Sequence, residues 1–399
     1  MNTLHNNFTR PKDWPQGETI DLGIHDLPHA SSTTEWWYIN AHIESAEGRK
    51  YSIFASFFRR LLKFNEETKE LDYAHSITWA LIDVEKEKYY NNSLIDQRTP
   101  KIGLEKLRKG EIVKDVRIRK AAIEMLEKGN VPYPDRLLEN QAVVATDKLD
   151  LQYDRNSYRK LDDGRYELIL EDVEHKVACT MILEPQKPVT RHGDNGVVFG
   201  VSAEDMFYYF IPRNKATGHI EIEGEKIPFE NSSAWYDHEF GRHRDEKEND
   251  PAASKDVAWN WISSQLTNGY EFTAYDLIDN ETNKGVGSYL ILIDPDGKRT
   301  QVEEFSLRPK GADWTSTRTF NDYPLEWVLE APSIGLYVEA KACFANQEYA
   351  TVISKPAFWE GRVEVKGKLG NKEIDGPGFV ERSGFISSSN LEEFFKVVS

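Results

Sequence analysis

The feature that most constrains the fold is a long succession of short β-rich segments joined by turn-forming pairs. Val, Ile, Tyr, Phe and Thr dominate these segments, and Asn-Gly or Asp-Gly pairs between such runs are strong hairpin signals. No alternation of strands with helices is present, which argues against a doubly wound nucleotide-binding fold. We therefore predict an all-β protein built from antiparallel barrels or sandwiches. The turn pairs are Glu47-Gly48, Asp163-Gly164, Glu223-Gly224, Asn268-Gly269 and Asp296-Gly297.

One stretch departs from this pattern. Residues 102–130 are rich in Lys, Glu and Leu at helical spacing and end at Gly129 before a Pro-rich turn. We predict a helical insertion of one or two helices, acting either as a solvated packing element or as a lid. A second polar stretch, residues 242–256, is a long loop that is either a lid or a tolerated insertion.

Length and charge limit the classes of function. A chain of 399 residues suggests two domains or one very large one. The net charge of −17 argues against a nucleic-acid partner, which would need a basic surface. No apolar run is long enough for a membrane span, and the N-terminal residues lack the apolar core of a secretory signal, so we expect a cytoplasmic protein. Two cysteines cannot form a disulfide scaffold.

The densest group of chemically active residues is Ala-Trp-Tyr-Asp-His-Glu-Phe-Gly at 234–241. In an extended strand, Trp235, Asp237 and Glu239 share one face, whereas His238 lies on the other. A carboxylic acid beside an indole in a water-free site has a raised pKa, which makes Asp237 a candidate general acid. The alternative is that Asp237 and His238 satisfy backbone groups at the end of a strand.

Two further positions are candidates for the site. Glu35 precedes three aromatic residues and shares a strand face with Trp37. It is either a site residue or a structural carboxylate paired with Arg59 or Arg60. His75 begins an apolar strand and is either a site residue or a satisfied core histidine.

Cofactor and metal signatures are absent from the sequence. There is no nucleophile elbow, P-loop, dinucleotide fingerprint or HExxH motif. Only His238 and His243, with Glu239 and Asp245, have spacing that would suit a metal, and they lie where a polar loop begins. We therefore expect no metal and no organic cofactor.

Several motifs together resemble those of the hydroxyneurosporene synthase (carotenoid 1,2-hydratase) and AttH-like group. They follow one another through most of the chain as SSTTEWWYINAHI at 31–43, FASFFRR at 54–60, YAHSITWALID at 73–83, MFYYFIPRNKATGHIEIEG at 206–224, AWYDHEFG at 234–241, WNWISSQL at 259–266, YPLEWVLEAP at 323–332, FWEGRVEVKG at 358–367 and GPGFVERSGF at 376–385. The resemblance implies two tandem lipocalin-like (calycin) β-barrel domains, over residues 1–228 and 229–399.

The resemblance also implies an activity. Members of the group add water to an isoprenoid alkene, and relatives include lipocalin-like Diels–Alderases and cyclases. The position that matches the proton-donating aspartate of the hydratases is Asp237, with His238 and Glu239 as supporting groups. The hydratases also use a His and a Trp on the preceding strand, where this chain has Phe207-Tyr208-Tyr209-Phe210.

These observations predict an enzyme of secondary metabolism that acts on a hydrophobic isoprenoid or polyene. Alkene protonation would give hydration or cyclisation, because aromatic faces stabilise a carbocation. A Diels–Alderase-type template that acts by proximity and orientation and a non-enzymatic lipophilic carrier remain as alternatives. We expect the pocket inside or between the barrels, unless these rings simply fill a core. Its expected substrate-binding residues are Glu35, Trp37, His75, Tyr209, Trp235, Trp259 and Trp261. The sequence does not indicate the substrate or the oligomeric state.

Overall fold

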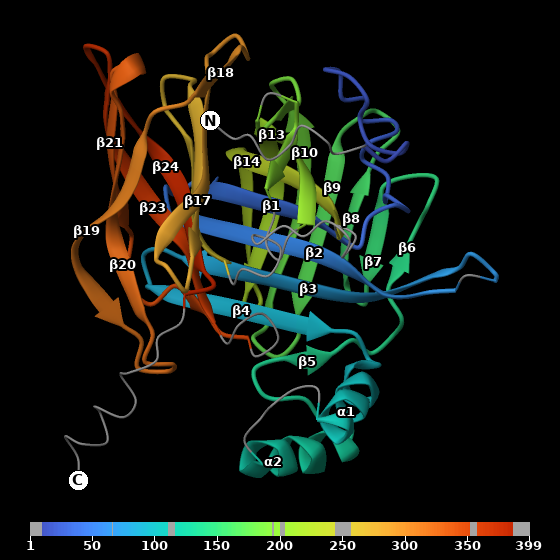
Figure 1. The fold of residues 1–399 in the computed structure, drawn as a ribbon. Helices are drawn as coiled ribbons and strands as arrows, with labels where there is room; N and C mark the ends of the chain where they lie inside the picture. The colour runs from blue at the N-terminus through green and yellow to red at the C-terminus, as the bar shows by residue number, and fades with distance from the viewer. Residues whose placement is uncertain are drawn as a thin grey trace.

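The computed structural model describes residues 10–65, 67–110, 116–193, 195–199, 204–243, 257–351 and 357–385. Strands dominate, and they form two sheets joined by the single passage of the chain between His243 and Val257. The sheets are antiparallel except where Leu94 and Ile95 pair in parallel with Arg136 and Leu137. The two sheets lie side by side, with the first in blue to yellow-green and the second in orange to red (Figure 1). The prediction of a mostly β protein with two barrel-like domains and a helical insertion is confirmed.

The first sheet contains the strands up to His243. Its main path runs β5-β4-β3-β2-β1-β14-β13-β10-β9-β8-β7-β6, and β11 and β12 pair with β13. Its strands are β1 (Thr34–Glu44), β2 (Lys50–Phe64), β3 (Leu71–Asp83), β4 (Lys88–Ile95), β5 (Arg136–Leu137), β6 (Val143–Val144), β7 (Asp150–Tyr153), β8 (Asn156–Lys160), β9 (Tyr166–Asp172), β10 (Val177–Pro185), β11 (Thr190–Arg191), β12 (Val197–Phe199), β13 (Glu204–Ile222) and β14 (Glu225–His243).

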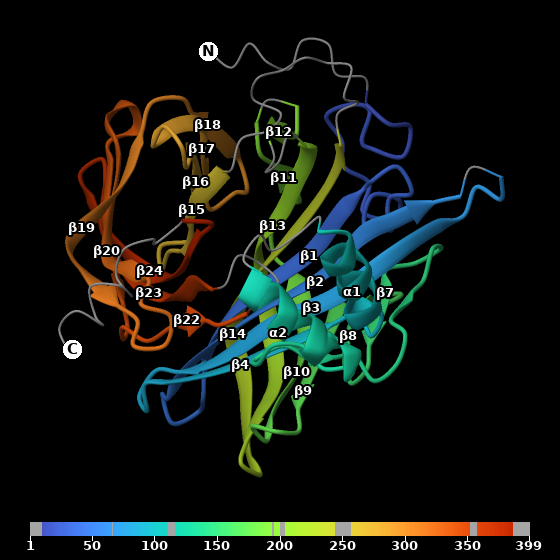
Figure 2. The same cartoon turned by 60° about the horizontal axis from the view of Figure 1, so that its bottom comes forward.

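The second sheet curls round on itself, as Figure 2 shows, in the order β18-β17-β16-β15-β24-β23-β21-β20-β19, with β22 paired to β23. A 3₁₀ turn at Pro332–Ile334 separates β20 from β21. Its strands are β15 (Val257–Gln265), β16 (Glu271–Asp279), β17 (Lys284–Ile293), β18 (Arg299–Val302), β19 (Ser306–Thr315), β20 (Asp322–Ala331), β21 (Leu336–Ala342), β22 (Glu348–Tyr349), β23 (Phe358–Leu369) and β24 (Lys372–Ser383).

The turn pairs lie where the sequence placed them. Glu47-Gly48 joins β1 to β2, Glu223-Gly224 joins β13 to β14, and Asn268-Gly269 joins β15 to β16. Gly224 has a φ of 90°, a conformation that costs glycine nothing and strains other residues. Local turn chemistry thus fixes these hairpins.

The boundary between the sheets differs from the expected division into 1–228 and 229–399. That division falls inside β14, which pairs along its length with β13 and for its second half with β1. The first domain therefore includes the whole AWYDHEFG motif, because the edge of β1 needs β14 as its hydrogen-bonding partner.

The helical insertion forms α1 (Thr99–Lys109) and α2 (Val116–Glu127), at one end of the first sheet beside β5 (Figure 1). The two helices approach closely at Gly103, where a Cβ would lie 2.9 Å from a methyl carbon of Leu126. Neither helix has the length and apolar character needed to cross a membrane. The polar stretch 242–256 lies almost wholly outside the described residues, so its role as a lid stays a prediction.

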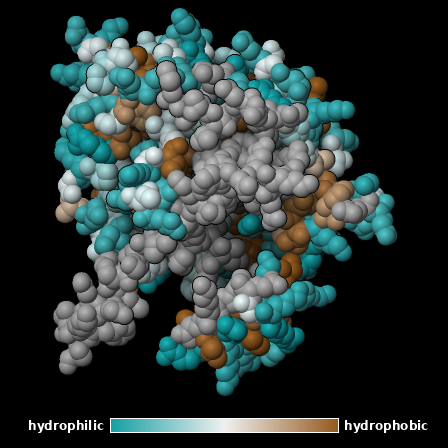
Figure 3. Space-filling view, viewed as in Figure 1, coloured by the Kyte–Doolittle hydropathy of each residue, from teal (hydrophilic) through white to brown (hydrophobic). Residues whose placement is uncertain are grey.

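The apolar residues form three clusters. One fills the interior of the first sheet and another fills the interior of the second. The third lies between the sheets and takes side chains from both, among them Tyr38, Phe54 and Trp235 from the first sheet with Trp261 and Tyr275 from the second. Strands β1, β13 and β14 are therefore buried on both faces. On the outside, the face in Figure 3 is mainly hydrophilic, with brown apolar atoms gathered beside the grey segments.

Candidate active site

Strand β14 separates two polar clusters, because its successive side chains point to opposite faces. Tyr236 and Phe240 belong to the apolar interior of the first sheet, and His238 stacks there on Trp37. Trp235 belongs to the cluster between the sheets and hydrogen-bonds Asp237. The alternation predicted for this motif is therefore confirmed.

Asp237 is a buried acid without a cationic partner among the described residues. Its side chain is 2% exposed, and the indole Nε1 of Trp235 donates a 2.7 Å hydrogen bond to its Oδ1. Burial raises the pKa of Asp237 to about 8, although hydrogen bonding to Trp235 and Tyr208 partly offsets this and the Glu381 charge adds to it. Asp237 therefore holds its proton at neutral pH.

Three more carboxyl groups approach this region. Glu239 lies two residues further along the same face of β14, whereas Glu360 and Glu381 come from the second sheet and are cross-strand neighbours on β23 and β24. The hydroxyl of Tyr38, which pairs in register with Asp237, donates a 2.6 Å hydrogen bond to Glu360. Both sheets thus contribute to one acidic cluster, which we call the intersheet acid cluster and define as Asp237, Glu239, Glu360 and Glu381.

Burial is the main reason why these carboxyl groups stay protonated. It raises the pKa of Glu381 to about 7, with a hydrogen bond from Trp259 acting in the opposite direction. Burial and the Asp237 charge raise the pKa of Glu239 well above its usual range, and burial and the Glu381 charge do the same for Glu360. Within the described ranges, none of the four forms an ion pair.

Aromatic rings surround the intersheet acid cluster. Trp235 stacks on Phe210 with ring centroids 4.9 Å apart, and Trp261 donates from Nε1 to the Tyr208 hydroxyl at 3.2 Å. Trp36 and Trp259, together with Glu239 and Glu381, are only half-buried. The cluster is therefore enclosed by aromatic rings, with two of its four carboxyl groups partly exposed.

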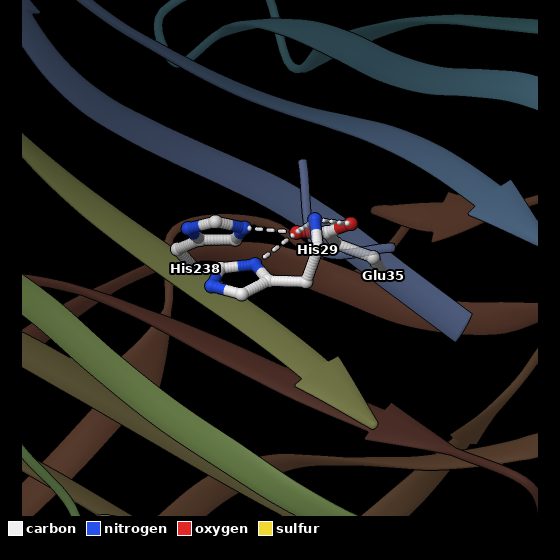
Figure 4. Close-up of side chains that lie close together, drawn as sticks. All are labelled: His29, Glu35 and His238. Atoms are coloured by element: carbon white, nitrogen blue, oxygen red, sulfur yellow. Dashed lines mark hydrogen bonds and ion pairs between the residues drawn. The ribbon is translucent and has the colours of Figure 1, made fainter. Parts of the chain in front are cut away.

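The second polar cluster lies on the other side of β14 (Figure 4). Glu35 Oε1 accepts hydrogen bonds from His29 Nδ1 at 2.8 Å and from His238 Nε2 at 2.9 Å, whereas Oε2 accepts one from Arg59 Nε at 2.6 Å. Burial would raise the pKa of Glu35, but Arg59 and the two histidines hold it well below its usual range. Glu35 is therefore an ionised structural carboxylate, and of the two expected partners Arg59 is the one it binds.

His29, Glu35 and His238 lie close enough together to hold a metal ion. A metal would need lone pairs from both imidazoles, but each directs a ring nitrogen at the same carboxylate oxygen. The Arg59 cation at the other oxygen would also repel a metal. This donor set fits a hydrogen-bonded network better than a metal site.

The network continues from His238 into a chain of phenols. His238 Nδ1 lies 2.7 Å from the Tyr209 hydroxyl, which lies 2.5 Å from Asp26 Oδ1. Lys160 neutralises Asp26 at 2.9 Å. Sequence reasoning missed Asp26 and His29, because they lie in a loop whose only signal was its mixture of charged and apolar residues.

The residues expected to bind substrate divide between the two faces of the first sheet. Trp37, Tyr209 and Glu35 lie in its interior, whereas Trp235 and Trp261 lie between the sheets and Trp259 packs against them. His75 contacts Tyr153 in the first domain, and burial lowers its pKa to about 4.

One cavity among the described residues lies elsewhere, and none of these residues lines it. It measures about 460 Å³ and has Lys187 and Arg213 on its wall, both bound to Glu271. Sequence reasoning also missed Glu360 and Glu381, although each is an acid inside an apolar strand, in FWEG and FVER.

The comparisons agree with this architecture. No curated protein matches the sequence. A crystal structure described as AttH from Nitrosomonas europaea is 21% identical, with a TM-score of 0.69 over 93% of this chain and 99% of that one. Kievitone hydratase from Nectria haematococca is 14% identical, with a TM-score of 0.64 over 90% and 91%, and CghA is 12% identical, with a TM-score of 0.51 over 90% of each chain. These likenesses show a shared fold.

The family is shown by the sequence itself. The model of the AttH-like family matches residues 15–385, which include both sheets and every residue of the two polar clusters. The chain belongs to the AttH-like family.

Proposed function

We propose that the protein is an enzyme that protonates a carbon–carbon double bond of a hydrophobic isoprenoid or polyene, with Asp237 as the general acid. The observation that carries this proposal is the environment of Asp237. It is a buried carboxylic acid that lies among aromatic rings between two sheets, and within the described part of the chain it is hydrogen-bonded by an indole rather than paired with a cation.

The chemistry of alkene protonation requires this kind of environment. The acid must be protonated before the reaction, and water must be kept away until a carbocation has formed. The faces of Trp235, Trp261 and Tyr208 supply negative quadrupole charge that stabilises a cation. Capture of the cation by water, followed by loss of a proton from that water, gives an alcohol. Attack by an internal alkene gives a ring and a new cation, which becomes neutral by losing a proton. The proton lost on either path restores the acid form of Asp237.

The residues beside Asp237 have separate roles in this proposal. Glu239 shares the face of Asp237 and is a second carboxyl group that burial keeps protonated, whereas His238 anchors β14 from the other face through Glu35. His238 is thus a positioning residue rather than a proton donor. The similarity of fold to kievitone hydratase supports water addition as one of the two outcomes.

The test is to incubate the purified protein with a lipophilic extract of a source strain that lacks it. The product mass separates the outcomes, because hydration adds one water and cyclisation leaves the mass unchanged. Asp237→Asn keeps the size of the side chain but removes the proton. A general acid contributes about 10²–10⁴-fold, so we expect turnover to fall by that factor while the variant stays folded.

Two results would contradict the proposal. Full turnover by a folded Asp237→Asn variant would favour a template that aligns a polyene for cycloaddition without proton transfer. A ligand that co-purifies with the protein and is never converted would favour a lipophilic carrier.

A further inference from the structure

His192 is an unusual residue of the intersheet region. It is 0% exposed, yet neither of its ring nitrogens has a hydrogen-bond partner among the described residues. It follows β11, and its backbone N–H donates to the carbonyl of Tyr208 at 3.1 Å. Nothing in the proposed proton transfer uses this imidazole.

A second unpartnered polar group lies against it. The ring of Tyr275 contacts the His192 ring edge-on, with centroids 5.1 Å apart, and the Tyr275 hydroxyl is also buried without a partner in the described part of the chain. The ring of Tyr208 lies 4.1 Å from His192 and 6.0 Å from Tyr275, and Tyr208 hydrogen-bonds Asp237. The two unpartnered groups are therefore one side chain away from the proposed acid.

Buried polar groups are normally hydrogen-bonded, because leaving one unpaired forfeits its hydration without compensation. Burial and the nearby Arg299 charge lower the pKa of His192 well below its usual range, so the imidazole is neutral. A neutral imidazole offers one donor and one acceptor, and a phenol offers both as well. A hydroxyl group can donate and accept at once, so it is able to pair with either of these side chains.

We propose that His192 and Tyr275 form a polar subsite that binds a hydroxyl group of the substrate. The substrate class is then a hydrophobic alcohol or phenol rather than a pure hydrocarbon. The identification of this occupant as the substrate rests on the proposed function, but the subsite itself can be tested by binding alone.

The experiment measures binding by tryptophan fluorescence with two matched pairs of probes. Farnesol is compared with farnesene, and a prenylated phenol with the corresponding prenylbenzene. Only the hydroxyl compound can hydrogen-bond the buried polar groups, so we expect the hydroxyl compound of at least one pair to bind about 10- to 100-fold more tightly. Tyr275→Phe and His192→Phe each reduce this preference to a few-fold or less, and Tyr275→Phe raises the melting temperature of the free protein.

Tyr158→Phe is the matched control. Tyr158 is also fully buried, and its hydroxyl has no partner among the residues that the structure describes, but it lies in the interior of the first sheet, so its removal should leave the preference intact. Equal binding of both members of each pair, or no saturable binding by any of the probes, would overturn the subsite. Asp237→Asn should keep the preference for hydroxyl compounds, because the subsite does not depend on the acid. If this variant also keeps full turnover, the proposed acid catalysis is wrong while the subsite still stands.

Discussion

At the scale of single residues, burial affects two carboxyl groups in opposite ways. Glu35 and Asp237 lie on adjacent paired strands and are both fully enclosed, but Glu35 has Arg59 beside it and Asp237 has an indole. The Arg59 cation lowers the pKa of Glu35 well below its usual range, whereas burial raises the pKa of Asp237 to about 8. The partner, not the depth of burial, decides which carboxyl is structural and which is a candidate acid.

Trp235→Phe tests whether the hydrogen bond from the indole sets the pKa of Asp237. The Trp235 indole lowers the pKa of Asp237 by binding the ionised form, so its loss should raise that pKa above about 8. Activity that depends on protonated Asp237 falls as pH rises through its pKa, and this fall should therefore move to higher pH. The measurement is the pH dependence of kcat/KM.

Trp327→Phe is the control for this change, since Trp327 fills the interior of the second sheet away from the intersheet acid cluster. Its pH profile should match that of the unmodified protein. A shift to lower pH in Trp235→Phe would show that the indole acts mainly by excluding water from Asp237.

At the scale of elements, β14 carries protonated carboxyl groups on one face and an ionised hydrogen-bonded network on the other. It carries Asp237 toward the second sheet and His238 toward the interior of the first, where the network of Glu35, Arg59 and His29 ties it to β1, β2 and the loop before β1. This network fixes the face that Asp237 presents, because a slip of one residue would exchange the two sides.

Arg59→Leu should show how much the inner network contributes to stability. The change leaves the Glu35 carboxylate buried without its cation, and breaking such a pair costs about 3–5 kcal/mol of unfolding free energy. Denaturant unfolding measures this cost. Arg155→Ala is the control, because Arg155 pairs with Glu171 at an exposed site and its loss should change stability far less. Equal effects of the two changes would contradict a structural role for the network.

At the scale of the whole molecule, the candidate active site belongs to neither sheet alone. Asp237 and Glu239 come from the first sheet and Glu360 and Glu381 from the second, joined by the bond from Tyr38 to Glu360. The two sheets must dock for the acids to be desolvated. Their raised pKa values are therefore a property of the assembled molecule, and they link its stability to pH.

We expect the unfolding free energy to decrease as pH rises from about 6.5 to 8. Below this range the buried histidines, whose pKa values are lowered, act in the opposite direction, because only the unfolded chain protonates them. Within it the unfolded chain has already lost its carboxyl protons, which ionise near pH 4, whereas Asp237 and Glu381 keep theirs up to about pH 8 and 7. The unfolded state then binds fewer protons, so stability falls. Glu35, with its lowered pKa, has the opposite effect and costs stability as pH falls below about 4.

Denaturant unfolding across this pH range checks the expectation. Asp237→Asn should reduce the slope and be more stable than the unmodified protein at pH 8, whereas Asp296→Asn at an exposed turn should leave the slope unchanged. An unchanged slope in Asp237→Asn would mean that Asp237 is ionised in the folded protein.

The sequence by itself determined the local features of this protein. Strand propensity and glycine turns gave the hairpins, alternation placed Asp237 and His238 on opposite faces of β14, and the spacing of residues 102–130 gave the helices. The neighbouring strand offered Glu35 two possible partners, Arg59 and Arg60, and the structure selected Arg59. These features depend on residues close in sequence or on adjacent strands, where the geometry of the backbone alone sets what can meet.

Only the tertiary structure decided which faces meet. It separated Trp37 and Tyr209 from Trp235 and Trp261, brought Glu360 and Glu381 to Asp237, placed Asp26 and His29 inside the first sheet, and assigned the whole of β14 to the first domain. Alternation says that a side chain leaves one face of a strand, but not what that face packs against. Here both faces of β14 are buried, one under its own sheet and one under the second, and only the docking of the sheets distinguishes a structural network from a desolvated acid.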